Sequence, residues 1–265
     1  MSTKPTTIPS PKLATHIGRS VRGQDAAIAD ITAAVARGRC RLLLIGPPAT
    51  GKTTAAVAIA ETFGGALRLD GAAFKDVATS RARLADAIAA RGRRTIVLDE
   101  AEKANPEAIS GIAAMLDADR TMGCVVTTNW NHADAVRIAD GVTCAAQRDA
   151  ALRRLLAERY TPTLIDALDA VIVFLPLDAA TVRDLVVEHA RSTAYARRFT
   201  VASISPAAIR HLVGTPYGVR EALFAAQRSL YPAAAGDVVR LVMRSGAVGI
   251  AVVGRMPVRR TPPRP

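Results

Sequence analysis

The stretch Gly46-Pro-Pro-Ala-Thr-Gly-Lys-Thr53 constrains this chain more than any other. It fits the pattern G-x-x-x-x-G-K-[ST], and the residues on both sides suit that pattern. The apolar run Arg41–Ile45 predicts a buried strand before it, and Thr53–Phe63 predicts a helix after it. A strand, this loop and a helix, in that order, form the setting in which such a loop binds phosphate. The alternative, a simple glycine-proline turn, leaves the flanking strand and helix unexplained.

The chemistry of the loop follows from its residue types. Glycines at 46 and 51 let backbone N–H groups face phosphate oxygens, and the following helix presents its positive end to the same anion. We expect Lys52 to bind the β- and γ-phosphates and the Thr53 hydroxyl to ligate Mg²⁺. The sequence therefore predicts ATP and Mg²⁺ as cofactors. The loop residues assigned to nucleotide binding are Gly46, Pro47, Pro48, Ala49, Thr50, Gly51, Lys52, Thr53 and Thr54.

Apolar runs and helical patterns alternate along the first two thirds of the chain. Such alternation needs crossover connections, so it predicts an α/β fold with a five-stranded parallel sheet flanked by helices. The predicted strands are Arg41–Ile45, Ala66–Leu69, Thr95–Leu98, Cys124–Thr127 and Ala170–Phe174. The predicted helices are Gln24–Arg37, Thr53–Phe63, Ser80–Arg91, Pro106–Leu116 and Asp149–Tyr160. Ligands of such folds bind beyond the carboxyl ends of the strands.

Polar residues stand at those carboxyl ends, namely Asp70, Asp99, Glu100 and Asn129. Two adjacent carboxylates after the buried strand at 95–98 repel each other unless a cation or water lies between them. We expect Asp99 to hold Mg²⁺ through its water shell and Glu100 to polarise the water that attacks the γ-phosphate. The alternative is an acidic helix N-terminus. The Asn129 amide can orient the same water or touch the γ-phosphate, although an asparagine after a strand is more often a turn residue.

Charge and composition limit the kinds of partner that this chain can have. The net charge of +12 is mostly arginine spread along the chain, which favours contact with nucleic acid or other acidic partners at low salt. The alternative is a set of solvated helix faces. The polar segment Met1–Lys12 has no apolar signal region, and Arg244 and glycines interrupt the longest apolar run near the C-terminus, Leu241–Val253. We expect no membrane insertion and a cytoplasmic location. The three cysteines lack metal-ligand spacing.

In order and spacing, several segments resemble an AAA+ ATPase of the Clp type, from about Ile17 to Val253. A single, minimal second Clp module is the nearest likeness, because a pair of strand patterns at 236–243 and 245–252 resembles the β-hairpin that closes its small domain. The segments that carry the resemblance are Val21–Gln24, the phosphate loop, Leu98-Asp-Glu-Ala-Glu-Lys-Ala-Asn-Pro106, the strand ending in Asn129, Val171–Leu177 and Gly218-Val-Arg220.

The resemblance implies a role for each matching residue. Asp99 and Glu100 correspond to the Walker B pair, Asn129 to sensor 1, and Arg220 to sensor 2, which reaches the nucleotide from the small domain. With Lys52 these residues form the expected catalytic set. Val21 and Gly23 are expected against the adenine. The alternative for Arg220 is an exposed arginine at a helix start.

The same resemblance divides the chain. We expect an N-terminal extension at 1–16, an AAA+ nucleotide-binding domain at 17–177, a helical lid with a terminal β-hairpin at 178–256, and a disordered basic tail at 257–265. The lid helices are predicted at Thr181–Tyr195, Pro206–Val213 and Val219–Leu230, and ATP is expected between domain and lid.

Two departures from the Clp pattern matter. Where that pattern carries an arginine finger, residues 160–169 place Ala167 in its position. A finger is worth about 10³ to 10⁵ in phosphoryl transfer, so we expect slow turnover unless a partner, or Arg153, Arg154 or Arg159, supplies it. The aromatic pore-loop signature is also absent from 70–80, where Phe74 next to Lys75 is either a reduced pore loop or a core residue.

These features predict an ATP-binding and ATP-hydrolysing protein that remodels or assembles a macromolecular partner. We expect a homo- or hetero-oligomer of AAA+ subunits that needs a partner for full activity, with a protein as partner or substrate. Two alternatives stay open: an ATP-switched, DNA-associated protein that loads factors or forms filaments, and a regulator with slow nucleotide turnover. Glu100 argues against a pure nucleotide binder, which has no need of a water-activating carboxylate.

Overall fold

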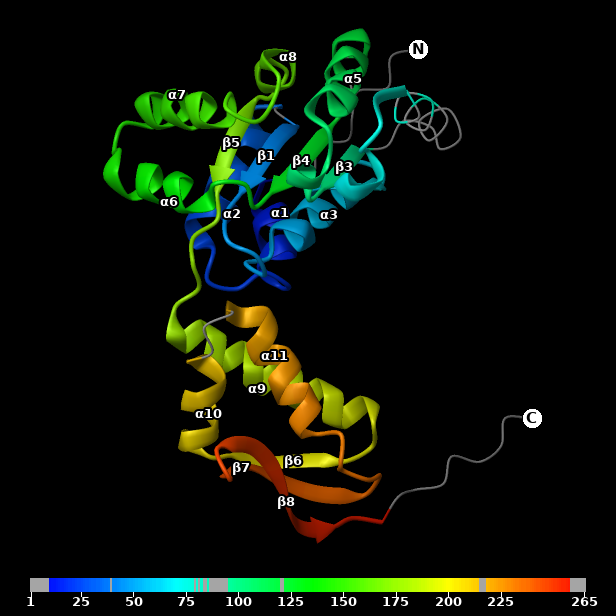
Figure 1. Cartoon of the computed structure of the whole chain (residues 1–265), viewed down its shortest axis with the longest axis vertical. Helices are drawn as coiled ribbons and strands as arrows, with labels where there is room; N and C mark the ends of the chain where they lie inside the picture. The colour runs from blue at the N-terminus through cyan, green and yellow to red at the C-terminus, as the bar shows by residue number, and fades with distance from the viewer. Residues whose placement is uncertain are drawn as a thin grey trace, which may run out of the picture. The chain divides into compact units, whose positions relative to one another are not determined.

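The structure is a computed structural model that describes residues 10–38, 40–78, 80, 82, 85, 95–119, 122–214 and 218–257. The chain divides into two compact units, Met1–Pro176 and Leu177–Pro265 (Figure 1). The first is built around a parallel sheet and the second around helices and a smaller sheet. Among the described helices, none combines the length and the apolar character that crossing a bilayer requires.

The sheet of the first unit has the strand order β2-β3-β4-β1-β5, and every pair of neighbours is parallel. This confirms the predicted five-stranded parallel sheet, and each strand end lies within one residue of its predicted position. The strands are β1 (Arg41–Ile45), β2 (Ala66–Asp70), β3 (Thr95–Asp99), β4 (Cys124–Thr128) and β5 (Ala170–Val173). Asp70 pairs with Asp99 in the register of β2 and β3, so the acidic strand ends lie at one edge of the sheet.

Helices cover both faces of this sheet, which is why strands β1, β3 and β4 are buried without alternation, whereas the edge strand β2 exposes Arg68. In β1, Leu42 and Leu44 point to one face, and Leu43 and Ile45 to the other. The first face packs against α1 (Ser10–Gly18), α2 (Asp25–Ala36) and α3 (Lys52–Thr62). The second packs against α5 (Pro106–Ala118), α6 (His132–Gly141), α7 (Ala145–Leu156) and α8 (Pro162–Asp166).

The structure differs from the predicted elements at several places. Residues from Ser10 onward form α1 rather than an extension, because Leu13 and Ile17, one helical turn apart, are both buried against the sheet. Helices α6 and α8 were not predicted, and α7 begins four residues before its predicted start at Asp149. Most of the predicted helix at 80–91 lies outside the described residues.

The second unit contains α9 (Ala179–Ala196), β6 (Thr200–Ile204), α10 (Pro206–Val213), α11 (Gly218–Ser229), β7 (Asp237–Arg244) and β8 (Ala247–Arg255). The predicted hairpin is present as antiparallel β7 and β8. The sequence did not indicate β6, which pairs parallel with β7 and makes a three-stranded sheet. Phe199, Val239 and Leu241 belong to the buried core of this unit. Of the tail predicted at 257–265, only Pro257 is described.

Candidate active site

The phosphate loop connects the end of β1 to the start of α3, and both of its glycines are needed for packing or conformation. A Cβ added at Gly46 would lie 2.4 Å from the carbonyl oxygen of Phe174. Gly51 is the N-cap of α3 with a φ of 96°, in the left-handed region, and a Cβ there would lie 3.0 Å from Val21. The loop therefore fits closely between β5 and the segment before α2.

Lys52 is buried inside this loop, with 6% of its surface exposed. Its ammonium donates hydrogen bonds to the carbonyl oxygens of Gly46, at 2.8 Å, and Pro47, at 2.6 Å. The Thr50 hydroxyl donates to the same Pro47 oxygen at 2.8 Å. A phosphate oxygen is a stronger acceptor for an ammonium than a neutral carbonyl, so a phosphate in the loop would gain the stronger interaction.

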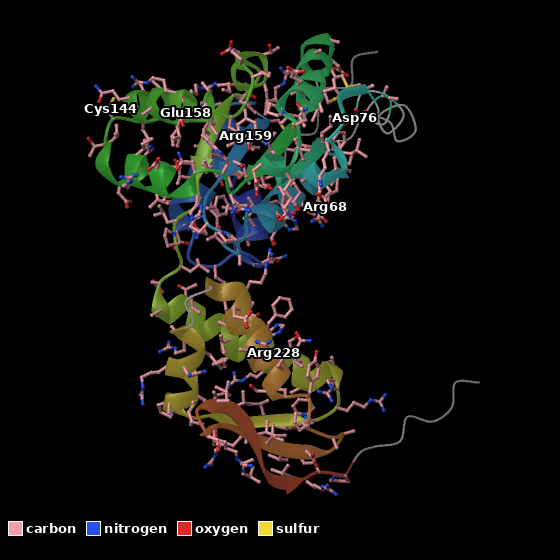
Figure 2. All side chains as sticks on the ribbon, viewed as in Figure 1. Arg68, Asp76, Cys144, Glu158, Arg159 and Arg228 are labelled. Atoms are coloured by element: carbon pink, nitrogen blue, oxygen red, sulfur yellow. The ribbon has the colours of Figure 1, made fainter. Side chains whose placement is uncertain are left out.

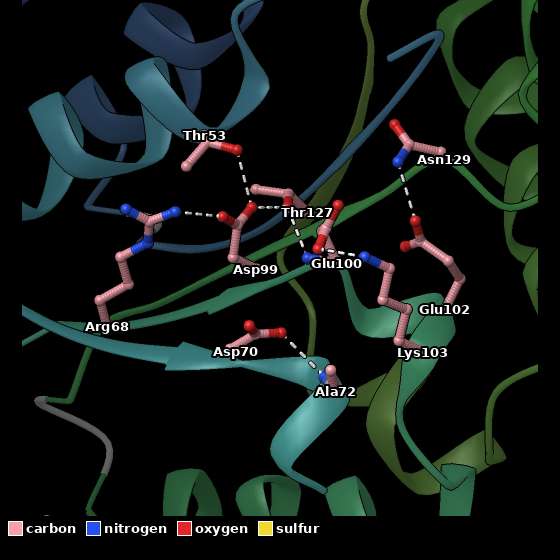
Figure 3. Close-up of polar contacts among 10 residues, drawn as sticks. All are labelled: Thr53, Arg68, Asp70, Ala72, Asp99, Glu100, Glu102, Lys103, Thr127 and Asn129. Atoms are coloured by element: carbon pink, nitrogen blue, oxygen red, sulfur yellow. Dashed lines mark hydrogen bonds and ion pairs between the residues drawn. The ribbon is translucent and has the colours of Figure 1, made fainter. Parts of the chain in front are cut away.

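Asp99 is the centre of the polar network at the sheet edge (Figure 3). Its Oδ1 accepts hydrogen bonds from the hydroxyls of Thr53, at 2.7 Å, and Thr127, at 2.6 Å. Its Oδ2 accepts one from the Arg68 guanidinium, also at 2.6 Å. One carboxylate thus joins the first turn of α3 to β4 and to β2.

These contacts decide the ionisation of Asp99. Burial alone would raise the pKa of this carboxyl, but hydrogen bonds from Thr127, Thr53 and Arg68 outweigh burial and hold the pKa below its ordinary value. An ionised carboxylate beside the Thr53 hydroxyl is the oxygen donor set that Mg²⁺ prefers. The described residues contain no group of three or more His, Cys, Asp or Glu that could hold a metal. A cation here would therefore also need phosphate and water oxygens, as Mg²⁺ commonly does.

Glu100 adopts a conformation that is rare for a residue other than glycine, with φ 54° and ψ 48°. It is the N-cap of the short helix η2 (Ala101–Lys103), and its backbone N–H donates to the Thr127 hydroxyl at 3.2 Å. Gly71 approaches so closely that an added Cβ would lie 2.2 Å from the Glu100 carbonyl oxygen. Strain of this kind costs about 1–3 kcal/mol and is found most often at functional positions.

Both residues expected to act on the attacking water have partners in η2 (Figure 3). The Lys103 ammonium lies 2.6 Å from Oε2 of Glu100. The Asn129 amide donates to Oε1 of Glu102 at 2.8 Å, while the other oxygen of Glu102 is buried without a hydrogen-bond partner. Asp70 has a local role instead, because its side chain caps η1 (Gly71–Ala73) through the Ala72 N–H.

The three arginines considered as internal fingers have different surroundings. Arg153 donates to Asp149 and to the carbonyl oxygens of Ile165 and Leu168, at 2.7 to 2.9 Å. Arg159, labelled in Figure 2, donates to the carbonyl oxygens of Glu102 and Ala104, both at 2.9 Å. These two hydrogen bonds secure η2. Arg154 is exposed on α7.

The other predicted positions are also located. Phe74 is 3% exposed and packs in the hydrophobic core, which favours a core residue over a reduced pore loop. Val21 is buried against Gly51, and Gly23, beside it, is exposed with a φ of 65°. Ala167 follows α8 as its C-cap. Arg220 is exposed in the first turn of α11, in the second unit.

Sequence reasoning assigned no role to four participants in the network: Arg68, Thr127, Glu102 and Lys103. Glu102 and Lys103 lie in the motif at 98–106, which carried the resemblance. Arg68 lies on the strand next to Asp99, and only the register of β2 against β3 reveals that they meet. Thr127 carried the clearest signal, because a hydroxyl near the end of a buried apolar strand needs a hydrogen-bond partner.

Comparison with known proteins finds one matching family and several relatives. Residues 42–139 match the family described as ATPase family associated with various cellular activities (AAA). The chaperone protein ClpB of Lactiplantibacillus plantarum is 25% identical over 218 residues, covering 66% of this chain and 25% of that protein. ClpB 2 of Parasynechococcus marenigrum is 27% identical over 216 residues, covering 66% of this chain and 24% of that protein. The chain thus spans about a quarter of the length of these relatives. Fold, motif order and sequence matches together show that this chain is similar to AAA+ ATPases of the Clp type, with the match to the AAA family lying at residues 42–139.

Proposed function

We propose that this protein binds ATP with Mg²⁺, hydrolyses it, and uses the nucleotide state to remodel or assemble a macromolecular partner. The observation that carries the proposal is the position of the Asp99 carboxylate, next to Glu100 in the chain. This carboxylate accepts hydrogen bonds from the hydroxyls of Thr53, at the end of the phosphate loop, and of Thr127, on β4. The names of the ClpB relatives, which are chaperones, favour a protein as that partner. We further propose that the protein acts as an oligomer and is located in the cytoplasm.

In this proposal the side chains act by exchanging partners. The Lys52 ammonium moves from the loop carbonyls to the β- and γ-phosphates, and Thr53 and Asp99 would hold the magnesium ion. When bound, the metal neutralises charge on the phosphate oxygens. Glu100 leaves Lys103 to accept a proton from the attacking water, and the Asn129 amide orients that water or contacts the γ-phosphate. Arg220 is proposed to contact the nucleotide from the second unit, and Val21 and Gly23 to contact the adenine.

The surroundings of the arginines support the proposal that a partner completes the site. Arg153 and Arg159 bind carbonyl oxygens of their own subunit, and releasing either would leave those carbonyls without a charged donor. Ala167 has no cationic group. The transition-state charge would then be neutralised by Arg154 of a neighbouring copy or by an arginine of another protein.

Calorimetry and turnover test the proposal together. The wild type is expected to bind a non-hydrolysable ATP analogue in the presence of magnesium, Lys52→Ala to lose binding, and Glu100→Gln to bind while losing turnover. A turnover rate that rises with protein concentration and disappears in Arg154→Ala would assign the finger to a second copy. A folded wild type that releases no heat with nucleotide and magnesium would end the proposal.

A second experiment addresses assembly. Glu100→Gln purified by affinity in ATP is expected to retain the assembled state together with its partner, with Lys52→Ala as the unassembled control. Recovery of monomer alone from Glu100→Gln would contradict an oligomeric mechanism.

One observation favours the DNA-associated alternative. Residues 177–265 contain thirteen arginines, no lysine and five carboxylates, so this unit carries +8 of the net charge of +12. ATP-dependent DNA binding that weakens steeply with salt would support that alternative. Turnover that DNA leaves unchanged and a co-purified protein raises would support protein remodelling.

A further inference from the structure

We propose that Arg68 is the resident counter-ion of Asp99 and gives up its place when magnesium enters with the nucleotide. The inference rests on the proposed function and adds a residue to it. Arg68 would then set how much magnesium the protein needs in order to bind ATP.

The geometry identifies Arg68 as the charged partner of a buried carboxylate. The side chain of Asp99 is 9% exposed and that of Arg68 is 60% exposed, and their Nη2 and Oδ2 atoms lie 2.6 Å apart. Arg68 and Thr127 lie on opposite sides of the carboxylate (Figure 3). Arg68 therefore reaches Asp99 from the solvent side of edge strand β2, and its charge helps to keep the carboxylate ionised.

The remaining contacts of Asp99 leave one oxygen for a cation. Oδ1 already accepts the hydroxyls of Thr53 and Thr127, so Oδ2, to which Arg68 donates, is the oxygen that a hydrated cation would contact. A guanidinium and a hydrated divalent cation at the same oxygen repel each other. The Arg68 guanidinium returns easily to water because its side chain is 60% exposed, and magnesium would replace the positive charge that it supplies to the buried Asp99. Exchange of the two cations therefore has a low cost.

A fixed role for Arg68 makes the opposite prediction. If Arg68 only oriented Asp99 toward the metal, its loss would weaken magnesium binding. If Arg68 competes with the metal, its loss strengthens magnesium binding. The sign of the effect therefore separates the two roles.

The test uses Arg68→Gln, which keeps a hydrogen-bond donor and removes the charge. Its control is Arg137→Gln, because Arg137 is an exposed arginine of the same unit that pairs with Asp134 on α6. Calorimetry measures the magnesium concentration at which binding of a non-hydrolysable ATP analogue is half complete. We expect this concentration to fall roughly tenfold in Arg68→Gln, since one positive charge near a divalent cation is removed. In Arg137→Gln it should stay within twofold. No change, or a rise, in Arg68→Gln would overturn the inference.

A second readout needs no nucleotide. In EDTA, Arg68→Gln should melt several degrees below Arg137→Gln, because the buried Asp99 loses its charged partner. Equal melting temperatures would also overturn the inference. The two proposals fail differently: a wild type that binds no nucleotide at saturating magnesium removes the proposed function and this inference with it. Normal wild-type binding with no shift in Arg68→Gln removes this inference alone.

Discussion

Replacing Thr127 by valine tests the network around Asp99 most directly. The side chain is 2% exposed, and its hydroxyl donates to Oδ1 of Asp99 at 2.6 Å and accepts from the Glu100 N–H at 3.2 Å. Valine has nearly the same shape, so Thr127→Val removes both hydrogen bonds without creating a large cavity. The change therefore isolates the polar contribution of one buried atom.

The structure gives the expected magnitude. A hydrogen bond to an ionised acceptor contributes about 1.5–3 kcal/mol, and leaving a partly buried N–H without a partner costs about 1 kcal/mol more. Thr53 and Arg68 remain on Asp99, so the carboxylate keeps two of its three donors. We expect the free energy of unfolding of the first unit to fall by about 3 kcal/mol.

The chain provides its own probe for this measurement. Trp130 is its one tryptophan and lies in the first unit, so the denaturant dependence of tryptophan fluorescence reports unfolding of that unit. The matched control is Thr32→Val, because the Thr32 hydroxyl bonds only to the Ile28 carbonyl of its own helix among the contacts described. We expect the control to change stability by less than about 0.5 kcal/mol. Equal losses in the two variants would refute the assignment of Thr127 as a link between Asp99 and Glu100.

Three further predictions concern other parts of the chain. Gly46→Ala should lower the free energy of unfolding of the first unit by about 1–3 kcal/mol, because the added Cβ would lie 2.4 Å from the Phe174 carbonyl oxygen. A Cβ added at Gly141 has no atom within 4 Å, so Gly141→Ala should leave stability unchanged in the same fluorescence assay. Cys144 is exposed at the turn between α6 and α7 (Figure 2), and of the three thiols only this one should react quickly with a thiol reagent in the native protein. Burial raises the pKa of Cys40 and Cys124 to about 12, which keeps these thiols protonated. Rapid labelling of more than one thiol would contradict this prediction. Arg197→Met should lower the melting temperature of the second unit by several degrees, as measured by circular dichroism. The Arg197 guanidinium donates to three carbonyl oxygens after α11, at 3.0 to 3.2 Å, and the substitution removes these hydrogen bonds. An unchanged melting curve would show that those contacts are dispensable.

Much of the first unit could be predicted because its signals are local. Each strand is an apolar run bounded by polar or turn residues, and the phosphate loop marks where β1 ends and α3 begins. The elements that were missed have weak local patterns. Helix α1 shows two apolar residues one turn apart, Leu13 and Ile17, after a polar, proline-containing start. Strand β6 has no buried residue and depends on its pairing with β7.

The sequence by itself determined the phosphate loop, the two carboxylates after β3, and the parallel sheet that brings them to one edge. Contacts within a loop or a strand are encoded by neighbouring residues, so a linear pattern can carry them. Only the tertiary structure decided that Arg68 and Thr127 share the Asp99 carboxylate, that Phe74 belongs to the core, and that Arg159 secures η2. These contacts depend on strand register and on the packing of helices far apart in the chain, and no local spacing encodes either.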